Sequence, residues 1–327
     1  MTQGRYIEIE QQGAPSVMQV KTVDFADPVE GEVLIHQKAL GMNFLDVYHR
    51  SGAYPLQMPS GIGTEASGVV AKVGAGVTDF KEGDRVAYGG GLPGGYGDYR
   101  NMPAARVVPV PDGVTDEQAA SSLMKGMTVE YLLERVYPVR CGQWVLFYAA
   151  AGGVGLIAGQ WGKSLGAHMI GVAGGPEKCQ LALDNGYEVC VDRHAGEDLV
   201  AKVKELTGGE GLPVVYDSIG KDTYETTLDC LGSRGMFVSF GTTSGPVPPV
   251  EAADLQKRDS LFFTRPTLVT YTAKREDLLM SAAKVFSKVA DGSITVEVGQ
   301  TYKLEDVVQA HEDFEAGKTT GSTLILP

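Results

Sequence analysis

Residues 143–166 read QWVLFYAAAGGVGLIAGQWGKSLG, an apolar strand followed by a turn of small residues and then an amphipathic helix. Ala150, Gly152 and Gly155 occupy the three small-residue places of the pattern G-x-G-x-x-G, with alanine in the first. Small residues in these places allow a tight turn, a close approach of the backbone to a pyrophosphate, and close packing of the helix on its strand. Free N–H groups at the helix start then favour the phosphate. The stretch therefore predicts a dinucleotide site, with Gly153 and Val154 in the same turn.

The chain on either side of this stretch divides into two kinds of pattern. From about residue 115 onward, helical stretches alternate with β-branched strands such as HMIGVA, YEVCVD, PVVYDS and GMFVSFG. This alternation predicts an α/β fold with a doubly wound parallel sheet. From residue 5 to about residue 111, short apolar runs broken by Gly, Pro and Asp predict a β-rich domain. After Phe263, two helical stretches and the strand STLIL do not extend the repeat, so this tail could return to the first domain.

Bulk properties narrow the class of protein. A chain of 327 residues is about right for two domains. No apolar run approaches the roughly 20 residues of a membrane span, and the polar N-terminus does not resemble a secretory signal, so we expect a cytoplasmic protein. The four cysteines form no C-x-x-C pair, which disfavours a zinc knuckle or a disulfide framework. The net charge of -13 makes nucleic acid an unlikely partner.

The residues after the second strand of the repeat indicate which dinucleotide is bound. NAD enzymes usually carry Asp or Glu there, but HMIGVA runs into Gly174 and Gly175. Lys178 follows one helical turn later, and Arg193 follows the third strand, from where it could reach the same pocket. The acidic residue Glu177, next to Lys178, argues against a phosphate at this place. Two cations and a missing acid favour the 2′-phosphate of NADPH.

Several further segments carry a resemblance to a known family: GMNFLDVYHRSGAYP (41–55), SGIGTEASGVV (60–70), LMKGMTVEYLL (123–133), VVYDSIGKDTYE (214–225), SFGTTSG (239–245) and TRPTL (264–268). Together with the glycine turn they resemble, in order and over essentially the whole chain, the zinc-free NADPH:quinone oxidoreductases. This is the zeta-crystallin-like branch of the medium-chain dehydrogenase/reductase superfamily. The resemblance implies a GroES-like catalytic domain built from residues 1–125 and 265–327, a Rossmann domain at 126–264, and a homodimer. The apolar segments GMFVSFG and SLFFTRPTL also suggest paired sheet edges.

The resemblance also implies roles for individual residues. It places Asn43 and Tyr54 beside the reacting groups and assigns Lys178 to the cofactor phosphate. It adds as cofactor-binding residues Asn43, Asp46, Tyr48, Lys125, Thr128, Tyr131, Ser218, Phe240, Gly241, Thr264 and Arg265. Two departures stand out: Arg193 replaces a usual tyrosine, and Gly317 replaces a usual arginine, so it stays open whether Lys318 restores that contact.

The same residues can be compared with those that other classes of enzyme need. Zinc alcohol dehydrogenases share this architecture, but Asn43 stands in place of their cysteine, and Gly63, Thr64 and Glu65 stand in place of their Gly-His-Glu. We therefore expect no metal. The chain has no G-x-S-x-G elbow, which a Ser–His–Asp hydrolase needs, so nucleophilic catalysis has no support. An NADPH-dependent enal or enone C=C reductase remains the alternative enzyme, and an RNA-binding or structural crystallin-like role remains the alternative outside catalysis, although the acidic charge opposes RNA.

The predicted reaction is direct hydride transfer from NADPH to a quinone-like acceptor. Reduced quinone oxygens are phenol-like and need no strong acid, so we expect no essential acid or base. Asn43 would hydrogen-bond the cofactor or the acceptor carbonyl, and Tyr54 would position the ring. The physiological acceptor, and whether one or two electrons are transferred at a time, stay open.

Overall fold

The computed structural model describes residues 2–327 and divides the chain into two compact units. The first unit contains the residues up to Met127 together with Tyr271–Pro327, and the second contains Thr128–Thr270. The chain thus leaves the first unit after Met127 and re-enters it at Tyr271. No helix within residues 2–327 has both the length and the apolar character needed to cross a membrane.

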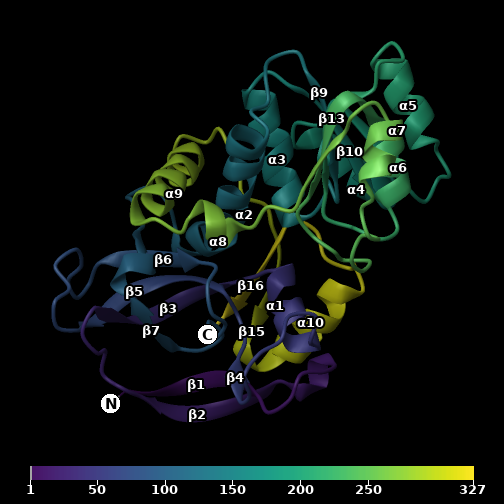
Figure 1. The fold of residues 1–327 in the computed structure, drawn as a ribbon. Coiled ribbons are helices and arrows are strands. Elements are labelled where there is room, and N and C mark those ends of the chain that lie inside the picture. The colour runs from purple at the N-terminus through teal and green to yellow at the C-terminus, as the bar shows by residue number, and fades with distance from the viewer. Residues whose placement is uncertain (1) are drawn as a thin grey trace. The chain divides into compact units, whose positions relative to one another are not determined.

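The first unit is built on a seven-stranded sheet in the order β15-β16-β3-β5-β6-β8, with β7 also paired to β3. The C-terminal strand β16 runs antiparallel to β3, with Ile325 opposite Leu40, and Figure 1 shows this yellow strand beside the violet β3. A smaller sheet has the order β2-β1-β4. The strands are β1 (Thr2–Ile9), β2 (Gln19–Phe25), β3 (Glu32–Met42), β4 (Ser60–Gly61), β5 (Glu65–Val73), β6 (Arg85–Gly89), β7 (Tyr99–Pro103), β8 (Val108–Pro109), β15 (Val298–Lys303) and β16 (Ser322–Leu326).

Helices close the ends of these sheets. Helix α1 begins after Asn43, whose backbone N–H donates to Asp46 in the first turn, and ends at Gly52, which adopts a left-handed conformation. The core between the sheets is apolar and includes Ile7, Ile35 and Ile325. The helices are α1 (Phe44–Ser51), α9 (Arg275–Ala290) and α10 (Val307–Glu315), with short 3-10 turns at Pro15–Val17, Ala104–Arg106 and Leu304–Asp306. Helices α2 (Asp116–Glu130) and α8 (Leu268–Tyr271) contain the two points at which the chain passes between the units.

The second unit has a six-stranded sheet in the order β11-β10-β9-β12-β13-β14, with every neighbouring pair parallel. Counted along the chain, this is the order 3-2-1-4-5-6 of a dinucleotide-binding Rossmann sheet. The strands are β9 (Trp144–Tyr148), β10 (His168–Ala173), β11 (Val189–Asp192), β12 (Leu212–Asp217), β13 (Leu231–Ser239) and β14 (Phe262–Thr264). The predicted α/β fold, with a β-rich domain and a doubly wound domain, is therefore confirmed.

Helices connect these strands by crossover segments, as parallel pairing requires. Val214 and Val215 of β12 are fully buried, as expected for a strand covered on both faces. The connecting helices are α3 (Gly153–Ser164), α4 (Pro176–Asp184), α5 (Leu199–Leu206), α6 (Tyr224–Cys230) and α7 (Ala252–Lys257). A π-helical segment, Tyr131–Val136, follows α2, and the hydroxyl of Tyr216 donates to the Leu132 carbonyl within it.

Candidate active site

The glycine turn of the second unit joins β9 to α3. A Cβ added to Gly155 would lie 2.6 Å from the Ala150 carbonyl oxygen and still closer to that of Ala149, so a side chain there would push α3 away from its strand. The Tyr187 hydroxyl donates to the Gly155 carbonyl at 2.7 Å. The turn therefore has the close packing that a pyrophosphate cradle requires.

The start of α3 is open to an anion. Its N-cap is Gly152, which offers no capping side chain, and the first turn contains no acidic residue. The N–H groups of a first helical turn have no partner within the helix, and the helix dipole favours negative charge there. This part of the chain thus fits the phosphates of a dinucleotide, and Gly153 and Val154 lie in that first turn.

The end of β10 is lined by basic side chains. A Cβ added to Gly174 would lie 3.0 Å from Arg193 Nε and 2.9 Å from His194 Cε1, so both side chains lie directly against this glycine. Asp192 Oδ1 accepts the backbone N–H groups of Gly175 at 2.8 Å and His194 at 2.9 Å. These two hydrogen bonds lower the pKa of Asp192. Arg193 and His194 thus lie beside Gly174 at the end of β10.

Lys178 lies in the first turn of α4, with its side chain half-buried, while Glu177 beside it is exposed. His194 was not singled out from the sequence. Its position beside Gly174 depends on the turn that Asp192 organises after β11, and no sequence pattern marks that turn.

The other site residues of the second unit gather at the carboxyl ends of its strands. A Cβ on Gly241 would lie 2.6 Å from the Ser218 carbonyl oxygen, so the segments after β12 and β13 are in contact. The Phe240 ring lies 5.3 Å from that of Phe147, and Arg265 donates to the carbonyl of Ser239 at 3.1 Å. Thr264 ends β14, while Thr128 and Tyr131 lie on the helical segment that enters this unit.

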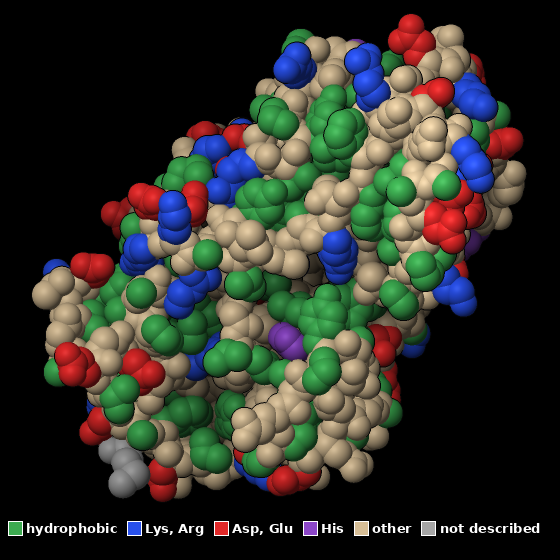
Figure 2. Space-filling model, in the orientation of Figure 1, with side chains coloured by type: hydrophobic (Ala, Val, Ile, Leu, Met, Phe, Trp, Pro, Cys, Tyr) green, Lys and Arg blue, Asp and Glu red, His purple; other side chains and the backbone are tan. Residues whose placement is uncertain are grey.

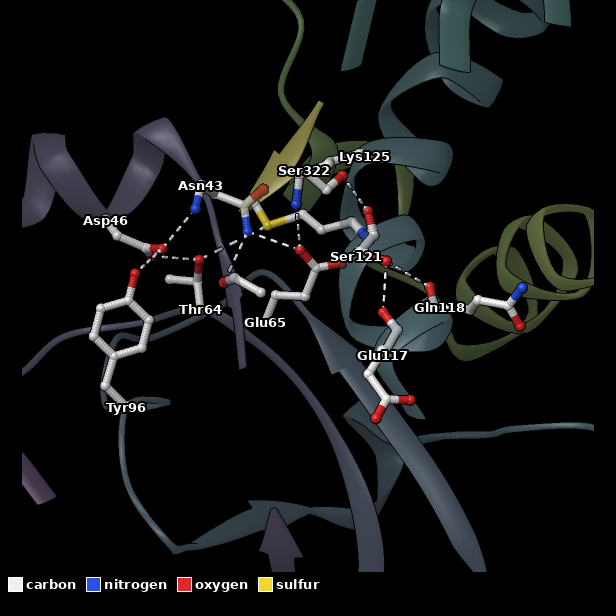
Figure 3. Close-up of polar contacts among 12 residues, drawn as sticks. Asn43, Asp46, Thr64, Glu65, Tyr96, Glu117, Gln118, Ser121, Lys125 and Ser322 are labelled. Atoms are coloured by element: carbon white, nitrogen blue, oxygen red, sulfur yellow. Dashed lines mark hydrogen bonds and ion pairs between the residues drawn. The ribbon is translucent and has the colours of Figure 1, made fainter. Parts of the chain in front are cut away.

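In the first unit, Asn43 stands between two buried carboxylates (Figure 3). Its backbone N–H donates to Asp46 Oδ2 at 2.9 Å. Its side-chain Nδ2 donates to Glu65 Oε2 at 2.8 Å and, more weakly, to the Gly41 carbonyl at 3.3 Å. Both amide hydrogens are thus directed at protein acceptors, which leaves none for the acceptor carbonyl that the sequence analysis considered.

Glu65 begins β5 and is completely buried. Besides Asn43, its Oε2 accepts the Lys125 ammonium at 3.1 Å, and its Oε1 accepts the backbone N–H of Met124 at 2.7 Å. Lys125 is only 5% exposed, so this is an ion pair removed from water. A buried charge is tolerated only with such a partner.

Asp46 is the second buried carboxylate of the cluster. It accepts the hydroxyl of Thr64 at 2.8 Å and that of Tyr96 at 2.9 Å. Burial raises the pKa of Asp46 to about 6, against the lowering effect of these hydrogen bonds and of Asn43 and Lys125. The carboxylate has no exposed surface, so it can act only on the side chains that it contacts within the cluster.

Two tyrosines extend from the same region. The Tyr48 and Tyr54 rings are 5.2 Å apart, and Tyr54 is 38% exposed, so one face of this aromatic pair is accessible. The backbone of Tyr54 is fixed by Gln12, which donates to its carbonyl at 2.8 Å. Lys318 forms an ion pair with Asp313 at 3.0 Å.

The donor atoms of the cluster decide whether it could hold a metal ion. Asn43, Thr64 and Glu65 do come together, but Glu65 is already paired with an ammonium group, which would repel a cation. Thr64 and Asn43 offer neither thiolate nor imidazole, the usual zinc ligands. Over residues 2–327, no cluster of three or more His, Cys, Asp or Glu side chains could hold a metal ion.

Comparison with known proteins places these features in a class. Residues 29–112 match the family model of the alcohol dehydrogenase GroES-like domain, and residues 153–281 match that of the zinc-binding dehydrogenases. A GroES-like domain joined to a Rossmann domain defines the medium-chain dehydrogenases/reductases.

Individual relatives narrow this superfamily to one family. The chain is 48% identical over 326 residues to a quinone oxidoreductase of Salmonella typhimurium, covering 98% of this chain and 99% of that protein. The structure of Escherichia coli quinone oxidoreductase complexed with NADPH is 46% identical, with a TM-score of 0.96 over 99% of this chain and 100% of that one. A 2-haloacrylate reductase of Burkholderia sp. is 38% identical over 98% of each chain. The chain belongs to the quinone oxidoreductase family, which confirms the resemblance drawn from its motifs.

The sequence analysis considered Thr64 and Glu65 only as residues in the place of zinc ligands, and it did not place Tyr96 beside Asp46. The signal was present in the glycine-rich stretch GIGTEASG, where two polar residues stand among small ones at the start of a buried strand. Tyr96 lies 50 residues from Asp46, and only the folded structure reveals that pair.

The buried Asp46 predicts a pH dependence of stability. Its pKa rises from 3.8 to about 6 on folding, so the stability that its protonated form contributes is complete below about pH 4 and is lost as pH rises through 6. The difference amounts to about 3 kcal/mol. We expect urea unfolding to show that wild type loses this much, relative to Asp46→Asn, between pH 4 and pH 7. A constant difference between the two proteins would contradict the raised pKa.

Proposed function

We propose that this protein is an NADPH-dependent quinone reductase that works without a metal ion. The observation that carries the proposal is the match over nearly the whole chain to quinone oxidoreductases, together with a glycine turn and an Arg193 side chain that suit NADPH. NADPH, when bound, supplies the hydride.

The residues of the chain have defined tasks in this proposal. The turn around Gly152 and Gly155 receives the pyrophosphate, and Arg193 and Lys178 receive the 2′-phosphate. Lys125 keeps N–H groups beyond the one that faces Glu65, so it can donate toward a bound ligand. The Tyr48 and Tyr54 rings offer an apolar face for a flat acceptor. A reduced quinone is phenol-like and takes its protons from water, which is why orientation suffices.

A C=C reductase is the second candidate, since the 38% identical relative is a 2-haloacrylate reductase. The higher identity to quinone oxidoreductases favours the quinone. An RNA-binding role is disfavoured by the net charge of -13, and Figure 2 shows Lys and Arg side chains interspersed with Asp and Glu over the visible face.

The acceptor can be settled by measuring NADPH oxidation against matched panels of quinones, enals and enones, each with and without a strong chelator. We expect the quinones to have the highest kcat/KM and the chelator to leave it unchanged. Preferential turnover of enals or enones would replace the quinone proposal with the C=C reductase. Loss of activity on chelation, restored by zinc, would overturn the metal-free reaction.

The phosphate site predicts cofactor preference. A charge-assisted hydrogen bond contributes about 1.5 to 3 kcal/mol, so Lys178→Ala and Arg193→Ala should each weaken NADPH binding by roughly tenfold to a hundredfold. NADH binding should change by less than about twofold, because NADH lacks the phosphate. Fluorescence titration of both cofactors measures this. Lys202→Ala, which removes an exposed lysine paired with Glu205 in the same unit, is the control. Equal wild-type affinity for NADPH and NADH would refute the phosphate site.

We further propose that the protein is a homodimer paired through β14, and that it is cytoplasmic. The four cysteines are free, as is usual in a reducing compartment. Strand β14 is the last strand of its sheet and exposes 56% of Phe262, and an apolar edge of this kind promotes pairing with another chain.

For the dimer, sedimentation should find two chains in wild type and one in Phe262→Lys, with NADPH binding retained. Leu92→Lys, at an exposed loop residue of the first unit, should leave the dimer intact. A monomeric wild type would overturn this part of the proposal.

A further inference from the structure

Glu65 has no role in the binding and hydride steps proposed above, yet it joins three elements of the first unit, because its donors come from the start of α1 and from α2 while it lies itself on β5. It receives three donors: the Asn43 amide, the Lys125 ammonium and the Met124 backbone N–H. It exposes no surface, so it cannot itself touch a cofactor or an acceptor. Any influence on a reaction must therefore pass through the groups that it holds.

The first of these groups is the Asn43 amide. With Nδ2 donating to the Glu65 carboxylate at 2.8 Å, the reversed amide would place its oxygen against a negative charge. The backbone of Asn43 is held independently by Asp46. Both the position and the orientation of this side chain are thus determined.

The second group is the Lys125 ammonium. Lys125 and Met124 are consecutive residues of α2, and the two oxygens of Glu65 bind one each. The carboxylate therefore fixes both the helix backbone and the end of the lysine side chain. Lys125 is only 5% exposed, and Glu65 is the anion in contact with its ammonium group, so the pair compensates the cost of burying the charge.

The surroundings leave Glu65 no alternative position. A Cβ on Gly41 would lie 2.6 Å from Glu65 Oε2 and closer still to the carbonyl oxygen of Ala120. Strand β3 and helix α2 thus enclose the carboxylate with no spare volume. Figure 3 shows the Glu65 side chain between Asn43 on one side and Lys125 on the other.

We propose that Glu65 is a positioning residue for the reaction: it fixes the Lys125 ammonium and, by accepting from Asn43 Nδ2, sets the direction of the Asn43 side-chain oxygen. This inference rests on the proposed quinone reduction. It assigns to the Glu65 carboxylate the task of holding one ammonium group, that of Lys125, at a fixed position. The charge would stabilise the negative oxygen that develops on the acceptor.

The central test compares Glu65→Gln, Lys125→Met and the double variant with wild type. Misplacement of a reacting group by about 1 Å can cost on the order of a hundredfold in rate. We expect Glu65→Gln to lower kcat by roughly tenfold to a hundredfold, with the NADPH dissociation constant, from fluorescence titration, changed less than about threefold. The double variant should be no slower than Lys125→Met, because Glu65 acts through Lys125.

The split between kcat and KM separates positioning from a merely structural role. Glu65→Gln should lower kcat while the KM for the quinone changes less than about threefold, because the binding surfaces stay in place and only the direction of the held groups is lost. Thermal unfolding should show that the double variant is more stable than Lys125→Met, which leaves a buried carboxylate without its cation.

Two further variants keep the test decisive. Glu65→Asp retains the charge but withdraws the oxygens, and it should also lower kcat, which covers the case in which Glu65→Gln does not fold. Glu130→Gln is the matched control, since Glu130 is a buried carboxylate on the same helix, paired with Arg135 at 3.3 Å. It should lose stability but keep the wild-type kcat.

A wild-type kcat in folded Glu65→Asp or Glu65→Gln would overturn the positioning role. Additive losses in the double variant would overturn it as well, because they would show that Glu65 does not act through Lys125. Failure of the proposed function would look different, since wild type itself would then not reduce quinones.

Discussion

The close approach of a strand to a helix at Gly41 is the constraint on which the polar cluster depends. Because Gly41 has no side chain, the Ala120 carbonyl of α2 lies directly against β3. Any larger residue would separate the two elements and pull the Met124 N–H and the Lys125 ammonium away from Glu65. The charged groups of the first unit are therefore held by backbone packing, and their hydrogen bonds complete an arrangement that the packing has already imposed.

The two units use different means to prepare for a ligand. The second unit relies on backbone N–H groups at the start of α3 and on the absence of side chains at Gly152 and Gly155. Its basic residue Arg193 is exposed at the surface, in contrast to the buried charges of the first unit. The first unit instead buries two carboxylates and one ammonium in a small volume, which is costly unless each group is satisfied. Such a cluster is rigid, and rigidity suits a reaction in which orientation matters more than proton transfer.

The sequence was most informative where the signal is local. The alternation of helices and strands predicted the parallel sheet, and the turn around Gly152 identified the dinucleotide-binding unit, because both features are set by residues close together in the chain. The partners of Glu65 were beyond this reasoning. Lys125 lies 60 residues away, and the pairing requires β3, β5 and α2 to be packed together first. Similarly, nothing local to Arg193 showed that His194 would lie against the same glycine.

The position of β16 also governs how the protein can be made. This strand forms hydrogen bonds with both β15 and β3, yet Ser322–Leu326 is synthesised long after Glu32–Met42. The second unit is continuous in sequence and lies between these two strands, so it can fold before β16 has been made. The first unit cannot close its main sheet until β16 has emerged from the ribosome. During translation, the edge of β3 that β16 will occupy stays open and prone to association with other chains.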